Sequence, residues 1–191
     1  MSLHQHLSDL RTRSCRDLVG MYFLVESGAH PDLLARMEFH DIVHRSLWRI
    51  DLQSDLERHA PFLFVAPPES AFDAWLGATV DTLPMTVISS RHSIDTLIRH
   101  LRRFSKFEDL NGRYFLRLGD PASLQLYVAS LAQHSEQVAR FFDQGAVGEL
   151  YFHDPRSGLS RCVSSLFEQN LEHAENDGYL VWRDGPVAED V

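Results

Sequence analysis

Hydrophobic positions along this chain follow the period of a β-strand in some segments and the period of an α-helix in others. Residues 18–25 form an almost wholly apolar run with valine and aromatic side chains, which predicts a buried strand. Shorter runs of the same kind predict further strands at residues 46–50, 61–65, 85–89, 149–153 and 179–182. These segments are separated by stretches with helical spacing, so both element types occur within one chain.

The clearest predicted helix begins after Ser93, a residue that suits the N-cap position. Its apolar residues recur at intervals of three and four, at Ile94, Leu97, Ile98, Leu101 and Phe104. The opposite face of this helix carries Arg99, Arg102 and Arg103. Other helices are predicted after Pro31, after Pro67-Pro68, and over residues 120–131, 135–142 and 161–176.

Two turn signals stand between the central helix and the next one. Asn111-Gly112 separates two strand-like segments and is a strong signal for a β-hairpin. Asp120 followed by Pro121 places a good N-cap residue before a proline at the first helical position, which predicts a helix start. The chain from 105 onward is therefore expected to form a hairpin followed by helices.

These elements predict a mixed α/β or α+β fold with a central mixed sheet, flanking helices and a more helical C-terminal portion. With 191 residues, one domain is expected. We divide it into an N-terminal helical arm (1–17), the α/β domain (18–152) and a short C-terminal extension with an acidic tail (153–191).

Composition narrows the function classes. The chain has 18 basic and 27 acidic residues, a net charge of −9, which argues against nucleic acid as a partner. Its two cysteines, Cys15 and Cys162, are far apart and fit a reducing compartment. The N-terminus does not resemble a secretory signal, and no apolar run is long enough for a membrane span. A cytoplasmic protein is expected.

The negative charge is unevenly distributed. Residues 91–117 carry seven basic and three acidic side chains, whereas residues 143–191 carry three basic and ten acidic ones. All but one of the basic residues of the chain are arginine; the exception is Lys106. The basic stretch is either an ordinary solvated face or a surface for a charged protein partner, a role that the arginine fork suits.

Three groups of residues are candidates for chemistry. His40, Asp41 and His44 resemble the HExxH zinc motif if they lie on one helical face, although a third ligand is not evident. His4 with His6, and Cys162 with His153 or His173, are weaker candidates for a metal site and a nucleophile. No phosphate-binding glycine motif and no GxSxG motif is present. The favoured interpretation of these motifs is therefore a protein that binds no metal and no cofactor.

The order of several motifs is similar to that of a known family. The run from His100 to Phe104, the Asn111-Gly112 turn and the segment from Tyr114 to Pro121 resemble the bacterial type VI secretion effector chaperones, also called adaptors, long described only as a domain of unknown function. Upstream segments at 22–29, 60–65 and 72–75 fit the same pattern. Gly119 and Ala122 depart from it, because the family commonly has an aromatic residue and an arginine there.

The resemblance implies a protein without catalytic activity. Such adaptors bind a cognate effector in the cytoplasm, often by its N-terminal region, and assist its loading onto the VgrG or PAAR spike. Contact with the effector is then expected from Arg99, Arg102, Arg103 and Arg117, and a structural role from His100, Leu101, Asp120 and Pro121. Alternatively, Arg102 and Arg117 are structural, with Arg117 joining the Arg102 helix to a carboxylate such as Asp120.

Two other functions stay open at the level of sequence. One is a small metal-dependent hydrolase that uses His40, Asp41 and His44. The other is an acidic immunity-type protein that neutralises a basic toxin.

Overall fold

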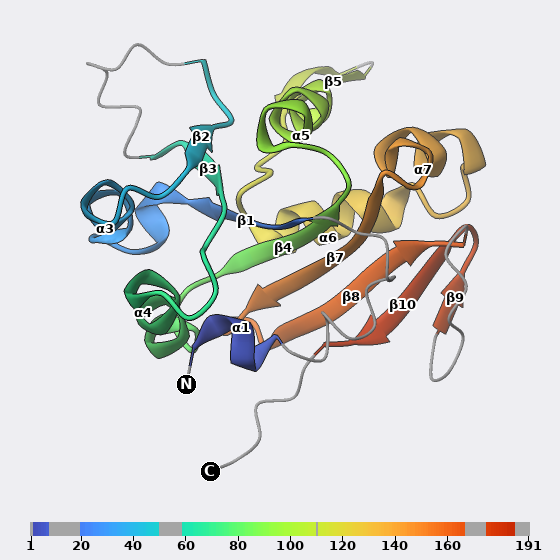
Figure 1. Cartoon of the computed structure of the whole chain (residues 1–191). Helices are drawn as coiled ribbons and strands as arrows, with labels where there is room; N and C mark the ends of the chain where they lie inside the picture. The colour runs from blue at the N-terminus through green and yellow to red at the C-terminus, as the bar shows by residue number, and fades with distance from the viewer. Residues whose placement is uncertain (1, 8–19, 50–58, 110, 167–174, 186–191) are drawn as a thin grey trace.

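The computed structural model describes residues 2–7, 20–49, 59–109, 111–166 and 175–185. Its central element is an eight-stranded antiparallel sheet with the order β2-β3-β1-β4-β7-β8-β10-β9 (Figure 1). The strands are β1 (Gly20–Glu26), β2 (His44–Ser46), β3 (Pro61–Phe64), β4 (Met85–Ser90), β7 (Val147–Asp154), β8 (Leu159–Ser165), β9 (Glu175–Asp177) and β10 (Leu180–Asp184). The predicted single-domain α+β class is confirmed.

The central strands are buried on both faces, which explains their continuous apolar runs. In β1, Phe23 is paired with Phe64 of β3 on one side and with Val87 of β4 on the other. These three side chains belong to one hydrophobic core. The next residue of β1, Leu24, points to the opposite face and belongs to a second core. The sheet therefore separates two cores.

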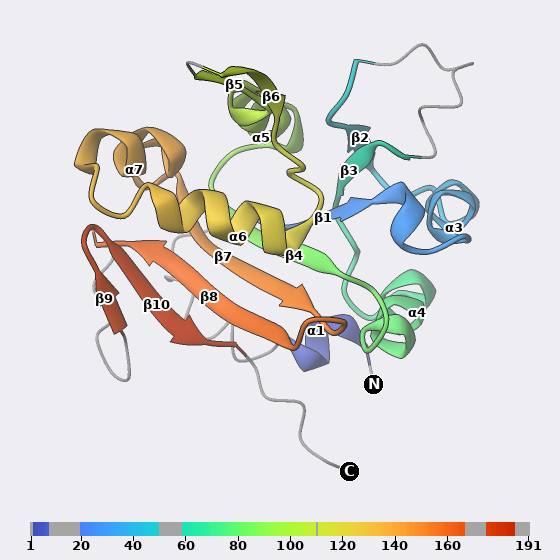
Figure 2. The ribbon, with the colours of Figure 1, turned by 180° about the vertical axis from the view of Figure 1, so that it is seen from behind.

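Helices cover each face of the sheet (Figures 1 and 2). One core is closed by α5 (Ile94–Leu101), α6 (Pro121–Ser130) and α7 (Ser135–Phe141), together with the single turns η3 (Arg102–Phe104) and η4 (Asp143–Gly145). The other is closed by α1 (Leu3–His6), α3 (Leu33–Phe39) and α4 (Ala71–Thr79), with η1 (Ser27–Ala29) beside α3. No helix within the described ranges is long and apolar enough to cross a membrane.

The short N-terminal helix α1 is anchored by a buried carboxylate. Asp73, in the first turn of α4, is fully buried. Its Oδ1 accepts hydrogen bonds from the backbone N–H of His4 at 3.0 Å and from the His4 ring Nδ1 at 2.9 Å. Its Oδ2 accepts from the backbone N–H of Glu69 at 3.0 Å. The described part of the predicted arm is thus packed onto the domain; residues 8–17 lie outside the described ranges.

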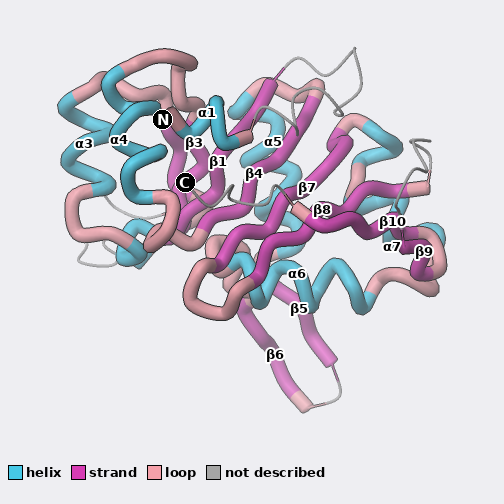
Figure 3. Tube along the Cα trace, turned by 90° about the horizontal axis from the view of Figure 1, so that it is seen from below, coloured by secondary structure: helices cyan, strands magenta, loops and turns pink. Residues whose placement is uncertain are grey.

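The predicted hairpin is confirmed as a separate two-stranded sheet of β5 (Lys106–Asp109) and β6 (Gly112–Phe115). Figure 3 shows that it extends away from the main sheet. Lys106 lies opposite Phe115 and Glu108 opposite Arg113. Because alternate residues of a strand share a face, Arg113 and Phe115 lie on the same side of the hairpin.

The two predicted helix starts are also confirmed in position. The Ser93 hydroxyl accepts a hydrogen bond from the Thr96 N–H at the start of α5. Asp120 is the N-cap of α6, and Pro121 is in its first turn. The Asp120 carboxylate, however, accepts from the Ser123 hydroxyl at 2.6 Å rather than from a helix N–H.

The C-terminal part of the chain differs from the prediction. The sheet is antiparallel throughout rather than mixed. The helix predicted over 161–176 is wrong for residues 161–165, which belong to β8; residues 167–174 lie outside the described ranges. Cys162 and Val163 point into opposite cores, so this short, serine-rich segment follows the period of a strand. After η4, the residues that the structure describes therefore form strands rather than the expected helix.

The boundary placed after residue 152 falls inside β7. The segment assigned to a C-terminal extension supplies β8, β10 and β9 to the same sheet. The last residues of the expected acidic tail, 186–191, lie outside the described ranges.

Candidate functional site

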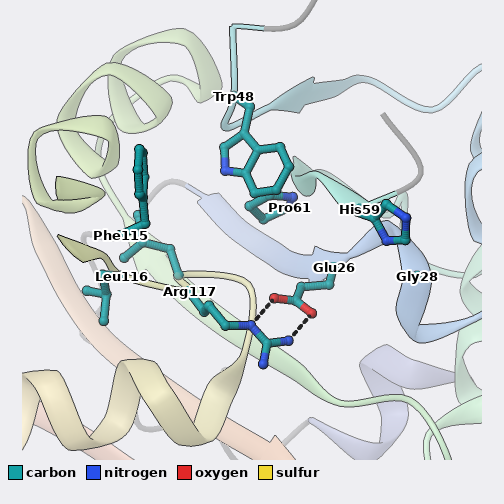
Figure 4. A pocket seen from close by; sticks show the side chains of 9 residues that line it. Glu26, Gly28, Trp48, His59, Pro61, Phe115, Leu116 and Arg117 are labelled. Carbon is teal, nitrogen blue, oxygen red and sulfur yellow. Dashed lines mark hydrogen bonds and ion pairs between the residues drawn. The ribbon is translucent and has the colours of Figure 1, made fainter. Parts of the chain in front are cut away.

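A groove of about 630 Å³ opens between the base of the hairpin and the edge strands of the main sheet. Figure 4 shows Trp48 above Pro61 on one side of it and Phe115 on the other. The groove is lined by Glu26, Gly28, Trp48, His59, Pro61, Phe115, Leu116, Arg117 and Leu118. Most of these side chains are apolar, and they come from four separate segments of the chain.

Two aromatic side chains of this groove are exposed to solvent. Phe115 is 73% exposed and Trp48 is 39% exposed. Below them, Leu118 is buried, and Leu116 packs partly against the core. Lys106, on the neighbouring strand, places its Nζ 5.3 Å from the centre of the Phe115 ring. Exposed aromatic side chains beside an apolar groove are typical of binding sites.

Arg117 closes one end of the groove through an ion pair with Glu26 at the end of β1. Its Nε and Nη2 donate to the two oxygens of Glu26 at 3.2 and 2.8 Å (Figure 4). The hydrogen bonds and the charge of Glu26 raise the pKa of Arg117 above its ordinary value. Asp120 is a second, more distant partner at 3.7 Å, so the predicted link to Asp120 is present, but Glu26 is the main partner.

Arg102 fixes the segment that carries Trp48. Its Nε donates to the carbonyl oxygen of Leu47 at 2.9 Å, and its Nη2 donates to that of Ser46 at 2.8 Å. The Leu47 carbonyl needs such a donor because its neighbour in the adjacent strand is Pro61, which has no N–H. Burial, and secondly repulsion from the nearby Arg49, lowers the pKa of Arg102.

Arg102 also covers the outer edge of the sheet. The hydrogen-bonding pattern between β2 and β3 leaves the carbonyl groups of His44 and Ser46 pointing away from β3. Arg45 donates to the His44 carbonyl at 2.8 Å, and Arg102 donates to that of Ser46. These two acceptors are thus occupied by side chains of the protein itself, which hinders the addition of a foreign strand.

The other two arginines of the predicted basic face are exposed. Arg99 donates to the backbone carbonyl of Asp95 and to the Thr96 hydroxyl, so it is held along α5. Arg103 follows in η3 on the outer side of the molecule. The structure thus leaves Arg99 and Arg103 accessible, places Arg117 in the groove, and uses Arg102 to hold the backbone beside it.

The residues expected to be structural lie in the interior. His100, Leu101 and Pro121 are buried, and Asp120 is half-buried. His100 Nε2 is 2.8 Å from the carbonyl oxygen of Phe141, which joins α5 to the end of α7. Its Nδ1 is buried and has no hydrogen-bond partner within the described part of the chain. Protonation would place an N–H there without an acceptor.

The environment of His100 predicts a pH dependence of stability. Burial lowers the pKa of His100, and the Phe141 carbonyl and Asp143 only partly oppose this, while Arg103 and His92 add to it. The unfolded chain therefore binds a proton first as the pH falls. The stability that His100 contributes is fully present above about pH 6.5, the ordinary pKa of a histidine in an unfolded chain. It is lost as the pH falls through the lowered pKa of the folded state.

We expect the free energy of unfolding of the wild type, measured by urea denaturation, to fall between about pH 7 and pH 5. In the His100→Gln variant this fall should be smaller, because the glutamine amide nitrogen matches the position of Nε2 and can still donate to the Phe141 carbonyl but does not titrate. The His134→Gln variant, changed at an exposed histidine, is the control and should keep the pH dependence of the wild type. An equal slope in His100→Gln would contradict this prediction.

The zinc-like arrangement predicted from His40, Asp41 and His44 is wrong. Helix α3 ends at Phe39, His40 is its C-cap, and Asp41 has a positive φ of 52°. His44 begins β2, where its Nδ1 is 2.7 Å from the carbonyl oxygen of Ile42. The two imidazoles therefore do not lie on one helical face, which is the geometry that the HExxH motif requires.

The described residues of the two weaker candidate sites, for a metal and for a nucleophile, have structural roles instead. His4 binds Asp73, Cys162 is buried, and His153 Nε2 is 2.7 Å from the carbonyl oxygen of Val80. His173 lies outside the described ranges. No group of three potential metal ligands occurs in the part of the chain that the structure describes.

Comparison with protein families gives one match, to the domain of unknown function DUF4123, over residues 21–138. The chain belongs to this family. Searches of the curated proteins and of the solved structures gave no match. In this DUF4123 protein the matched range extends from β1 into α7 and contains every residue of the groove. Strands β7 to β10, which complete the sheet, lie beyond it.

Gly119 contributes to the shape of the groove in this DUF4123 protein. A Cβ atom added there would lie 2.7 Å from both the Glu26 side chain and the Pro61 ring, and 3.2 Å from the backbone of Glu26. The lack of a side chain therefore lets the segment that follows the hairpin approach the ends of β1 and β3 closely. Glu26 and Pro61 both line the groove, so a larger residue at 119 requires a different groove.

Sequence reasoning missed several residues of the groove in this DUF4123 chain, notably Glu26, Trp48, His59 and Phe115. Exposure cannot be derived from hydrophobicity, and these positions meet only because the hairpin and the edge strands are brought together by the fold. One signal was available: Phe115 lies between Arg113 and Arg117 in a strand-like segment, an alternation that leaves the aromatic residue on the same face as its basic neighbours.

Proposed function

We propose that this protein is a non-catalytic adaptor that binds a type VI secretion effector in the cytoplasm and assists its loading onto the VgrG or PAAR spike. The observation that carries the proposal is the exposed aromatic groove, which lies entirely within the DUF4123 range. The motifs from His100 to Pro121, which resemble the adaptor family, surround this same region of the fold.

The physical character of the groove supports a protein ligand. Exposed aromatic side chains such as Phe115 and Trp48 supply large contact areas at interfaces, and a few of them carry most of the binding free energy. The groove is open and shaped by two different elements, the hairpin and the sheet edge, so it can accommodate a chain segment. Its two charged lining side chains, Arg117 and Glu26, are paired with each other.

The proposal is tested by co-expression, in turn, with each large protein whose gene lies beside the gene of this protein. We expect a stable complex on size-exclusion chromatography, and we expect that deletion of the adaptor gene abolishes export of that protein without changing export of unrelated effectors. The product of an unrelated effector gene serves as the control for binding.

Two results would overturn this proposal. The first is the absence of a complex with any neighbouring effector or spike protein. The second is a complex in which the toxicity of the partner is suppressed and its export is unaffected, which is the behaviour of an immunity protein.

A further inference from the structure

The floor of the groove is apolar, and most of the charged side chains at or near its rim are cationic. Four cationic side chains stand at or near its rim: Lys106 over the Phe115 ring, Arg117 at one end, Arg102 bound to the carbonyl groups of residues 46 and 47, and Arg49 next to Trp48 and close to Arg102. Among the described lining residues the only carboxylate is Glu26, which Arg117 neutralises. Asp120 also lies near Arg117, at 3.7 Å, so among the described residues at and near the rim the cations still outnumber the carboxylates.

The hairpin adds to this asymmetry. Lys106, Arg113 and Phe115 lie on one of its faces, together with Glu108, which is paired with Arg113. Because the Lys106 ammonium group lies over the Phe115 ring, a ligand that packs on Phe115 also meets a cation. This local excess contrasts with the net charge of −9 for the whole chain.

The neighbouring sheet edge is not the recognition element. The outward carbonyl groups of His44 and Ser46 already accept hydrogen bonds from Arg45 and Arg102. A ligand that added a strand at β2 would have to displace both arginines. Recognition at this place therefore depends on side chains that enter the groove.

We infer that this groove binds an acidic segment of a partner protein, one that inserts an aromatic or large aliphatic side chain between Phe115 and Trp48 and directs its carboxylates toward Lys106 and Arg49. The identity of the partner rests on the proposed function, whereas the chemistry of the segment follows from the groove. Opposite charges at the rim speed association and select against basic segments, while the aromatic contacts supply most of the affinity.

The inference is tested by selecting peptides from a library of random short peptides displayed on phage, with the full-length protein as target. We expect the selected peptides to be enriched in Asp and Glu together with at least one aromatic or large aliphatic residue. Affinity for a synthesised member of the selected set should fall with rising salt concentration.

Matched variants show whether the peptide binds in the groove or elsewhere on the surface. Phe115→Ser and Lys106→Glu should each weaken binding of the selected peptide by about tenfold or more. Phe39→Ser alters another exposed phenylalanine, on α3, and Arg91→Glu reverses an exposed charge outside the groove lining; both should bind like the wild type. Circular dichroism of all four variants checks that they are folded.

The inference is overturned if no peptide is selected, if the selected peptides are basic or uncharged, or if Phe115→Ser binds them as well as the wild type does. It is also overturned if light scattering shows a dimer that Phe115→Ser converts to a monomer, since the groove would then bind a second copy of this chain.

The same variants distinguish this inference from the proposed function. If the neighbouring effector binds the wild type and Phe115→Ser equally well, the adaptor role stands and the groove inference fails. If acidic peptides bind in the groove but no secretion protein forms a complex, the inference stands and the adaptor role fails.

Discussion

Replacement of Asp73 by alanine is expected to lower the free energy of unfolding by about 3–5 kcal/mol, because several hydrogen-bond donors lose a charged acceptor and each buried donor left unsatisfied costs about 1–3 kcal/mol. The carboxylate is fully buried and accepts three hydrogen bonds, from the backbone and ring of His4 and from the backbone of Glu69. Alanine leaves the two His4 donors buried without this acceptor, the Glu69 N–H loses its partner, and α1 loses its polar attachment to α4. Urea denaturation followed by circular dichroism measures the loss.

The matched control is Asp81→Ala, because Asp81 is exposed shortly after the end of α4. We expect it to change stability by less than about 0.5 kcal/mol. Asp73→Asn retains one carbonyl oxygen as an acceptor and should fall between the two. A loss in Asp73→Ala as small as that in Asp81→Ala would mean that the buried carboxylate does not hold α1.

The stabilisation that Asp73 provides depends on pH. Burial alone raises the pKa of this carboxyl, but the hydrogen bonds and the proximity of His4, together with the Glu69 N–H, outweigh it and leave the pKa below its ordinary value. The stabilisation is therefore present above about pH 3.9, the unfolded value, and is lost as the pH falls through the lowered pKa. The difference between wild type and Asp73→Ala should diminish over that acidic range.

Replacement of Arg102 by alanine is expected to cost about 2–3 kcal/mol of stability, since hydrogen bonds from a charged group contribute about 1.5–3 kcal/mol. The variant removes the donors to the carbonyl groups of Ser46 and Leu47, and Pro61, the strand neighbour of Leu47, has no N–H to take over. Arg102→Lys should recover only part of the loss, because an ammonium group lacks the planar fork that reaches both oxygens.

Arg103→Ala is the control for this prediction, since Arg103 is the next residue and is exposed. Thermal or urea denaturation should show little change in that variant. If Arg102→Ala were as stable as Arg103→Ala, then Arg102 would not hold the backbone beside Trp48, and its earlier assignment as a partner contact would regain weight.

The sequence predicted elements well where one local signal was strong. The period of three and four in α5, the Asn111-Gly112 turn of the hairpin and the Asp120-Pro121 start of α6 each depend on neighbouring residues only, and each is confirmed. The helix predicted near Arg161 failed because the segment is short and serine-rich, and its strand character comes from pairing with β7 and β10.

The site was less accessible to prediction than the fold. The periodicity of α5 indicated that Arg102 lies on a polar face, but its acceptors are carbonyl groups near position 46, more than fifty residues earlier in the chain. Likewise, Arg117 pairs mainly with Glu26 because the fold places β1 beside the segment that follows the hairpin. Such pairs are determined by tertiary structure rather than by local pattern.

The order of strands in the sheet has a consequence for the synthesis of the protein. Strand β4 lies between β1 and β7, and β7 is the first strand beyond the family match. While the chain emerges from the ribosome, β4 is available long before β7, with an unpaired and apolar edge that invites aggregation. A fragment that ends at residue 138 lacks the strand that pairs with β4, so we expect that β4 is covered on this side only after the last quarter of the chain has been made.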